Sequence, residues 1–487
     1  MGIGAAWIAV LGAPGCKPAK RTSKTTLSTV KAAPARSQSV WTFRSRPDLN
    51  PPAVEVATRA HDIAPGYVFI APKVGVGQDG PMIVDDLGRL VWFSNGKYAR
   101  DFKVQRYRGE PVLTWWDGKI VQGHGVGEYA IFDNSYREIA RVQAGNGYRG
   151  DLHEFLITPQ DTALLTTYAS VPMDLSVVGG PEDGAVWDGI AQELDIETGE
   201  VLFEWHSLEH VGLEESYYAP AKDISRPLDY FHINSIDVDH DDNLLISARN
   251  TSTVYKVDRK SGEVIWRLGG KNSDFQMGPG TRTAFQHDAR RQRDGTITIF
   301  DNGAAPKMHD QSRGISLELD MERMRATLIR EFVHPDKLLA TSQGNLQVLP
   351  NGDVFIGWGS EPFFSEFSGD GELLFDARFV SNTNESYRAF RFPWSGHPGG
   401  NPAIAAESSA DDEEVTVYAS WNGATEVATW QVLAGPGPKK LRPVGSVPRE
   451  GFETAIMVHT THPYVGVRAK DRSGRVLGAS EAVKLRQ

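Results

Sequence analysis

The sequence of 487 residues contains one cysteine, Cys16, which excludes an intrachain disulfide and a metal site built on several thiolates. No apolar run approaches the roughly 18 residues that a membrane-spanning helix needs. The G-x-x-x-x-G-K-[ST] pattern that holds nucleotide phosphates is missing, which disfavours a nucleotide-dependent transferase of that type. The net charge of -11 argues against nucleic acid or an anionic membrane as the main partner.

The first 47 residues contain no acidic residue, and the first one in the chain is Asp48. Residues 2–13 are mostly apolar, as in the core of a signal peptide, whereas residues 17–40 are basic and rich in Ser, Thr and Ala, as in a transit peptide. We therefore expect residues 1–40 to be a signal-like or transit-like segment or to be disordered, and we predict secretion, with a transit peptide as the alternative. Glycosylation sequons occur at Asn250 and Asn384.

Glycine and proline are abundant, at 49 and 28 residues, as expected of a chain with many turns between short strands. One pattern recurs: a turn with Gly, then alternating apolar residues that end in an aromatic. It occurs at residues 86–92, 197–205, 260–266 and 369–375. Glycine supplies the left-handed turn position, and the alternation is typical of a half-buried strand.

A second pattern places a histidine just before an apolar strand, at His153, His232 and His287, with Gln343 at the matching position of a fourth unit. The last three starts are separated by 55 and 56 residues. Four short strands at this period indicate a propeller blade. We predict an all-β fold with a six-bladed β-propeller over residues 41–405. The longer step after His153 requires inserts, which we expect to be mobile loops at residues 170–192 and 207–228.

The pattern changes after residue 405. Residues 415–421 and 428–433 alternate cleanly between apolar and polar side chains, and further strands follow. About eighty residues of this kind predict a small Ig-like β-sandwich over residues 406–487. We expect it to be a structural unit without chemistry of its own.

The repeat predicts a site, because the inner strands of a propeller line one channel. His153, His232 and His287 are expected to meet there. Arg249 ends the strand that pairs with the His232 strand, and Asn234 shares a strand face with His232. The remaining histidines are expected in loops or on the surface, with the channel mouth as an alternative for His124; they include His124, His206, His210, His240, His309 and His334.

Two chemistries suit three imidazoles, one guanidinium and one carboxamide. Three histidines can bind Zn, Cu or Fe, but Glu154 and Asp288 directly follow their histidines and are therefore expected to point to the opposite face. We predict no metal. The other chemistry is transfer of an anionic group such as sulfuryl, in which one histidine is the nucleophile and the others stabilise charge and move a proton. The basic cluster Arg290, Arg291 and Arg293 is expected on a solvated hairpin face.

Five stretches resemble the fungal and actinobacterial branch of the arylsulfotransferase family: residues 45–49, 229–237, 246–249, 266–270 and 285–289. The resemblance spans residues 41–400. It implies a propeller that moves a sulfuryl group from an aryl sulfate donor to a phenolic acceptor through a sulfohistidine intermediate, with no nucleotide donor and no cofactor. It departs from the bacterial enzymes, whose extra sandwich is N-terminal and which contain a disulfide.

The resemblance also assigns roles. His287 would be the nucleophile, and His232 and Arg249 would bind sulfuryl oxygens and protonate the leaving phenolate. Asn234 and His153 would orient the group. A non-catalytic propeller that binds a ligand, and a propeller used for metal-dependent lyase or isomerase chemistry on a small metabolite, are the alternatives. The sequence leaves the donor, the acceptor and the oligomeric state open.

Overall fold

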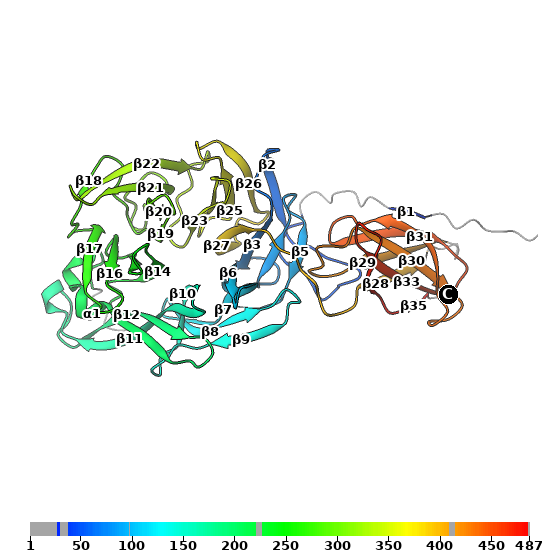
Figure 1. The fold of residues 1–487 in the computed structure, drawn as a ribbon, viewed down its shortest axis with the longest axis horizontal. Coiled ribbons are helices and arrows are strands. Elements are labelled where there is room, and N and C mark those ends of the chain that lie inside the picture. Colours follow the sequence, from blue (N-terminus) through cyan, green and yellow to red (C-terminus); the bar gives the residue numbers. More distant parts are fainter. Residues whose placement is uncertain (1–26, 30–37, 97, 221–225, 409–413, 486–487) are drawn as a thin grey trace, which may run out of the picture.

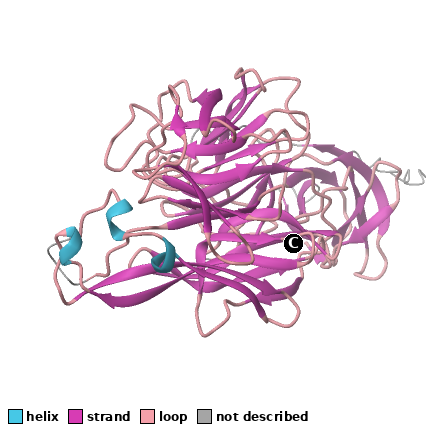
Figure 2. Cartoon of the chain, turned by 60° about the vertical axis from the view of Figure 1, so that its left-hand side comes forward, coloured by secondary structure: helices cyan, strands magenta, loops and turns pink. Residues whose placement is uncertain are grey.

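The computed structural model describes residues 27–29, 38–96, 98–220, 226–408 and 414–485. Strands make up nearly all of the regular structure in these residues, and helix is confined to α1 (Ser207–His210) and to the 3-10 turns η1 (Ser176–Val178) and η2 (Leu213–Glu215). Figure 1 shows the propeller strands arranged in a ring, with a separate strand-rich unit at the C-terminal end, and Figure 2 shows how little helix there is beside the strands. No helix in the described part of the chain is long and apolar enough to cross a membrane.

Six antiparallel blades form the propeller, and two of them join into one sheet through a bridge between Gly127 and Gly150. Their strands, from inner to outer, are as follows. Blade 1 contains β27 (Glu385–Phe392), β3 (Tyr67–Lys73), β4 (Met82–Val84) and β5 (Leu90–Phe93), and blade 2 contains β6 (Arg100–Tyr107), β7 (Glu110–Val121), β8 (His124–Phe132) and β9 (Glu138–Val142). Blade 3 contains β10 (Gly150–Ile157), β11 (Thr162–Met173), β12 (Gly184–Asp195) and β13 (Val201–His206).

The other three blades follow in chain order. Blade 4 contains β14 (Ile233–Val238), β15 (Leu244–Ala248), β16 (Thr253–Val257) and β17 (Val264–Gly269), and blade 5 contains β19 (His287–Arg291), β20 (Ile297–Asp301), β21 (Arg313–Asp320) and β22 (Arg325–Val333), with β18 (Gln276–Met277) parallel to β22. Blade 6 contains β23 (Asn345–Val348), β24 (Val354–Gly357), β25 (Phe363–Phe367) and β26 (Leu373–Phe379), with β2 (Val54–Arg59) on its outer edge. Blade 1 closes the ring because its inner strand comes from the end of the propeller sequence and its other strands from the beginning.

The predicted all-β propeller with six blades is confirmed. The starts expected at residues 232, 287 and 343 coincide with the inner strands β14, β19 and β23. Aromatic residues that end the repeated pattern lie in outer strands, where Trp266 and Phe375 are buried. Buried apolar side chains from adjacent blades share cores, as in the cluster that joins Leu245 of blade 4 to Ile299 of blade 5. The period of the repeat reflects this packing of one sheet on the next.

The expectation of mobile loops is wrong for most of the first insert. Residues 162–173 and 184–195 are the two twelve-residue strands β11 and β12, which pair along their whole length. Pairing satisfies the backbone polar groups of this hairpin, so its Gly and Pro content does not prevent strand formation. The second insert contains α1 and η2, and residues 221–225 lie outside the described residues.

Two further sheets form the C-terminal unit, and they share one core. One sheet contains β1 (Leu27–Thr29), β32 (Glu453–His459), β29 (Glu414–Ser420) and β28 (Ala403–Ser408). The other contains β31 (Arg442–Pro448), β30 (Thr429–Gly435), β33 (Tyr464–Lys470), β34 (Val476–Ala479) and β35 (Val483–Lys484). Val417 of the first sheet and Trp430 and Val467 of the second are fully buried in that core. The pair is therefore a β-sandwich, and its Ig-like topology stays a prediction.

Two details differ from the expected boundaries. The boundary at residue 406 falls inside β28, which begins at Ala403. Leu27–Thr29, which the sequence places in the N-terminal segment, form β1 and pair with β32, whereas residues 1–26 and 30–37 lie outside the described residues. The sequon residues Asn250 and Asn384 are 2% and 1% exposed, so neither amide is accessible to a glycosylating enzyme in this fold.

Candidate active site

Histidines lie at one mouth of the channel, where the inner strands begin. His287 is the first residue of β19, His232 directly precedes β14, and His153 is the fourth residue of β10. Inner strands of a propeller run in one direction, so their first residues gather at the same end. The rings of His153 and His232 are 4.7 Å apart between centroids, and both residues are close enough to His287 to lower its pKa. The structure thus brings the three predicted histidines together.

Two of these histidines are each held by a carboxylate. The Nδ1 of His232 lies 2.5 Å from Asp229 Oδ2, and the Nδ1 of His153 bonds to Asp151 Oδ2. Burial alone would raise the pKa of Asp151, but His153 overcomes it and the pKa falls to about 2. A carboxylate at Nδ1 fixes the tautomer, so that Nε2 faces away from it, and stabilises the protonated ring.

Neither carboxylate was predicted from the sequence. The signal was present as an aspartate two or three residues before the histidine, at Asp151 and Asp229. Strand alternation puts Asp151 and His153 on one face of β10. Asp229 reaches His232 through a turn, which the left-handed φ of 57° at His232 terminates.

His287 has a different environment, because its partner is a neutral amide. Its Nδ1 donates to Asn302 Oδ1 at 2.7 Å. The amide nitrogen of Asn302 donates to the carbonyls of Ala340 and Gln343, which fixes the orientation of the amide. Nε2 of His287 therefore has the lone pair, and it accepts the Gln343 backbone N–H at 3.2 Å. Burial, followed by Arg249 and His232, holds the pKa of His287 well below its usual value, so the ring is neutral.

Arg249 supplies the positive charge next to these histidines. Its guanidinium donates to Thr341 O at 3.1 Å and to the Tyr218 hydroxyl at 3.2 Å, and it lies 5.0 Å from the ring centre of Phe285. It makes no ion pair with a carboxylate of the described chain, so its charge acts on the histidines. Asn234 is fully buried and donates from Nδ2 to the Gln286 carbonyl of the next blade, which makes it a link between blades 4 and 5.

The expectation that His124 lies in a loop or on the surface is wrong. This residue is 3% exposed, its ring centre is 4.0 Å from that of Tyr168, and it lies 5.8 Å from that of His232. Burial lowers the pKa of His124 to about 4. Tyr387 of β27 completes this wall, 5.7 Å from His153 between ring centres. Of the two glycines that flank His124 in the sequence, Gly123 lies in a turn with open space beside it, whereas Gly125 packs closely against Trp116 and the backbone of Leu152.

One group of residues in this wall could hold a metal ion. His124, Asp229 and His232 each offer a ligand atom, and these atoms lie within 4.8 Å of one another. Two imidazoles and one carboxylate form a donor set that zinc accepts. Glu154 and Asp288 point away from the histidines, as strand alternation predicts, but Asp229 provides the carboxylate that the sequence analysis did not find.

A buried network of charges lies directly beneath the histidines. It consists of three carboxylates and three cations from β6, β10, β19 and β27: Asp101, Glu154, Asp288, Lys103, Arg290 and Arg388. Glu154 contacts all three cations, and the side chain of Arg388 is fully buried. Arg290 was expected on a solvated face, but its side chain is 17% exposed and pairs with Asp288 at 2.7 Å. The network joins four inner strands across the channel.

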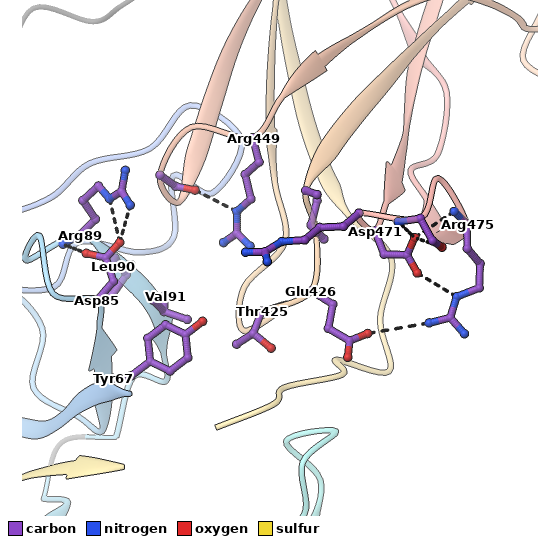
Figure 3. A pocket seen from close by; sticks show the side chains of 15 residues that line it. Tyr67, Asp85, Arg89, Leu90, Val91, Thr425, Glu426, Arg449, Asp471 and Arg475 are labelled. Atoms are coloured by element: carbon purple, nitrogen blue, oxygen red, sulfur yellow. Dashed lines mark hydrogen bonds and ion pairs between the residues drawn. The ribbon is translucent and has the colours of Figure 1, made fainter. Parts of the chain in front are cut away.

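A cavity of about 780 Å³ lies elsewhere, between the propeller and the sandwich (Figure 3). Its acidic groups are already paired: Asp85 with Arg89 at 2.7 Å, and Asp471 with Arg475 at 3.0 Å. None of the channel histidines lines it. This cavity is therefore separate from the cluster of predicted histidines.

The family model for arylsulfotransferase (ASST) matches residues 103–380, which is more than half of the chain and includes every histidine of the predicted trio. The chain belongs to the arylsulfotransferase family. No curated protein sequence matches it. As an arylsulfotransferase family member it has the propeller described above, and Arg249 also lies within the matched region.

Solved structures with similar chain traces are distant from this arylsulfotransferase family member. A protein of unknown function from Bacteroides caccae is 12% identical, with a TM-score of 0.40, and the match covers 67% of this chain and 98% of that one. A catalytically inactive virginiamycin B lyase from Staphylococcus aureus, solved with quinupristin, is 7% identical, with a TM-score of 0.33 and coverage of 84% and 99%. A protein of unknown function from Dyadobacter fermentans is 10% identical, with a TM-score of 0.35 and the same coverage. These matches contribute nothing to the assignment of the site.

Proposed function

We propose that this enzyme transfers a sulfuryl group from an aryl sulfate to a phenol, without a nucleotide donor, through a sulfohistidine at His287. The proposal rests on the different groups that accept from Nδ1 of the three histidines. His287 is neutral and its Nε2 has the lone pair, whereas Asp229 at Nδ1 of His232 favours the protonated ring, which can donate a proton from Nε2, and Asp151 occupies the same position at His153. A nucleophilic imidazole must be unprotonated at the attacking nitrogen, whereas an imidazole that acts as a general acid must be protonated.

In the first half of the reaction, Nε2 of His287 attacks the sulfur, and the bond from sulfur to the aryl oxygen breaks. The phenolate leaves with the electron pair of that bond and takes the proton from His232. Arg249, whose guanidinium has no carboxylate partner in the described chain, stabilises the charge on the sulfuryl oxygens. In the second half an acceptor phenol gives its proton to His232, its oxygen attacks sulfur, and the bond from nitrogen to sulfur breaks.

Intact-protein mass tests this proposal. The protein is incubated with 4-nitrophenyl sulfate without an acceptor. The reaction is quenched without acid, because the N–S bond of a sulfohistidine is acid-labile. We expect a gain of about 80 Da, the mass of one SO3 group on a covalent intermediate. His287→Ala is expected to show no gain. An unmodified wild-type protein that nevertheless releases nitrophenol would contradict the covalent route.

The carboxylate behind His232 provides a pH-dependent prediction. Burial lowers the pKa of His232, and Asp229 opposes that shift. Asp229→Asn removes the opposing charge, so the pKa falls further, by about one unit or more. The ring is then protonated only at lower pH. We expect the alkaline decline of kcat to move to lower pH by that amount, measured as the pH profile of nitrophenol release. An unshifted profile with a uniformly lower rate would mean that Asp229 has only a structural role.

The metal-binding group favours a second candidate, metal-dependent lyase or isomerase chemistry, because His124, Asp229 and His232 form a donor set. We expect sulfuryl transfer to survive treatment with EDTA and added Zn²⁺ to inhibit it, because zinc would occupy His232. His124→Gln should raise the zinc concentration for half inhibition about tenfold or more. Loss of turnover with EDTA, restored by metal, would instead support the metal-dependent candidate. A propeller that only binds a ligand would show affinity without turnover and would tolerate His287→Asn.

A further inference from the structure

Arg100 occupies in blade 2 the position that His287 occupies in blade 5. Each is the first residue of its inner strand, and each is followed by an aspartate with a left-handed φ, 55° at Asp101 and 57° at Asp288. In both strands the pairing with the next strand shifts register within the first four residues. The cation three residues after each of them contacts Glu154 in the charge network. The two strand starts therefore have the same local structure.

Blades 2 and 5 are three positions apart in a ring of six, so these two strand starts lie on opposite sides of the channel. Between them, blades 3 and 4 supply His153 and His232 on one side. Blade 1 supplies Tyr387, two residues after the start of β27, and it lies 5.7 Å from His153 between ring centres. Arg100 thus belongs to the same layer as the histidines and lies opposite His287.

The guanidinium of Arg100 is buried with few partners. The residue is 5% exposed, its Nη1 donates only to the neighbouring Ala99 carbonyl at 2.7 Å, and its Nε has no hydrogen-bond partner among the described residues. It forms no ion pair within the described chain. Burial is the main reason that its pKa falls to about 10, which still leaves it charged at neutral pH. A buried charge without a partner is costly, and a bound anion would remove that cost.

The nearest acidic groups are not available to Arg100 as partners. Glu385 acts on it only at a distance, because one carboxylate oxygen binds Lys73 Nζ at 2.9 Å and the other accepts from Gln343 at 3.2 Å. Asp79 also lies beyond ion-pair distance, and burial raises its pKa. Lys73, itself 8% exposed, adds positive charge to this side of the channel.

We propose that Arg100 binds a carboxylate on the aromatic substrate, so that the enzyme prefers phenols and aryl sulfates that carry a carboxylate at the end remote from the reacting oxygen. This inference rests on the proposed function for the position of the reacting group. Arg249 acts on His287 and is the cation for the sulfuryl group. Arg100 is on the far side, so it serves a second anion, and the planar guanidinium matches a carboxylate in a bidentate pair.

Acceptor selectivity tests the inference. The acceptors are 4-hydroxybenzoate, 4-hydroxyphenylacetate and 3-(4-hydroxyphenyl)propanoate, each beside its methyl ester, with 4-nitrophenyl sulfate as donor. We expect kcat/KM for the best acid to exceed that for its ester by about tenfold to one hundredfold, the range for a charge-assisted pair. Arg100→Gln should bring this ratio close to one, and Arg100→Lys should leave it intermediate. Arg106→Gln, an exposed arginine of the same strand, is the matched control and should keep the wild-type ratio.

Calorimetric binding of each acid and ester separates the two proposals, because binding requires no transfer. If no sulfuryl transfer occurs but the wild type binds the acid tenfold more tightly than the ester, and Arg100→Gln does not, the carboxylate site stands and the proposed function fails. If transfer occurs with equal selectivity in wild type and Arg100→Gln, the inference is overturned and Arg100 serves only the loop that contains Asp79. A thermal melt of each variant identifies loss of fold, in which case Arg100→Lys decides.

Discussion

Replacing His287 with alanine is expected to lower kcat for aryl sulfate turnover by at least about a thousandfold. Loss of the covalent nucleophile removes the whole reaction pathway, whereas loss of a binding contact would only weaken it. The ring bonds only to Asn302 and to the Gln343 backbone, and both partners are uncharged, so the variant should fold. Nitrophenol release in the presence of an excess of phenol measures the effect. His287→Asn should be inactive as well, because an amide cannot carry the sulfuryl group.

His240→Ala is the matched control for this experiment. His240 is an exposed histidine in the hairpin turn of blade 4, and among the described residues its backbone N–H donates to Asp239. It should retain wild-type turnover. Substantial activity in folded His287→Ala would show that another group accepts the sulfuryl, and His232 would be the next residue to replace.

Replacing Glu154 with glutamine is expected to destabilise the protein by about 3–5 kcal/mol, the range for breaking a buried ion pair by removing one partner. The side chain is completely buried and neutralises Lys103, Arg290 and Arg388. Burial alone would raise the pKa of Glu154, but these cations hold it far below its usual value. Glutamine leaves the three cations with only two carboxylates, Asp101 and Asp288, so one positive charge of the network is uncompensated. The midpoint and slope of urea denaturation measure the change.

Glu197→Gln provides the contrast, because Glu197 also pairs with an arginine, Arg108, at 3.0 Å, but both side chains are more than half exposed. Exposed pairs of this kind contribute at most about 1 kcal/mol, so this variant should be nearly as stable as wild type. Similar stability losses in the two variants would mean that the channel network is solvated. A loss in Glu154→Gln alone would show that it holds the four inner strands together.

The sequence predicted the architecture because a repeat records it directly. Each blade buries its faces against its neighbours, so the same pattern of turn, apolar alternation and terminal aromatic recurs. The period led to the starts of β14, β19 and β23 and to the convergence of His153, His232 and His287. Segments that depart from the repeat were harder to predict. Residues 170–192, which include the far part of the hairpin of β11 and β12, were expected to be a mobile loop, because strand pairing depends on partners that composition does not reveal.

The site is less predictable than the fold, because most of its contacts join residues from different strands. Asp151 and Asp229 lie within three residues of their histidines, so the sequence contains that signal. Asn302, which fixes the tautomer of His287 by accepting from Nδ1, directly follows the next strand, β20. His124 reaches the site from a different blade than His232.

The amino-acid sequence by itself thus determined the propeller, the channel and the meeting of three imidazoles, because periodicity encodes the packing of equivalent strands. Only the tertiary structure decided which imidazole is neutral and which are backed by carboxylates, because a ring's protonation depends on what surrounds it in space. The same holds for Arg100, which resembles any strand residue in the sequence. Its likeness to His287 depends on two blades that face each other across the ring.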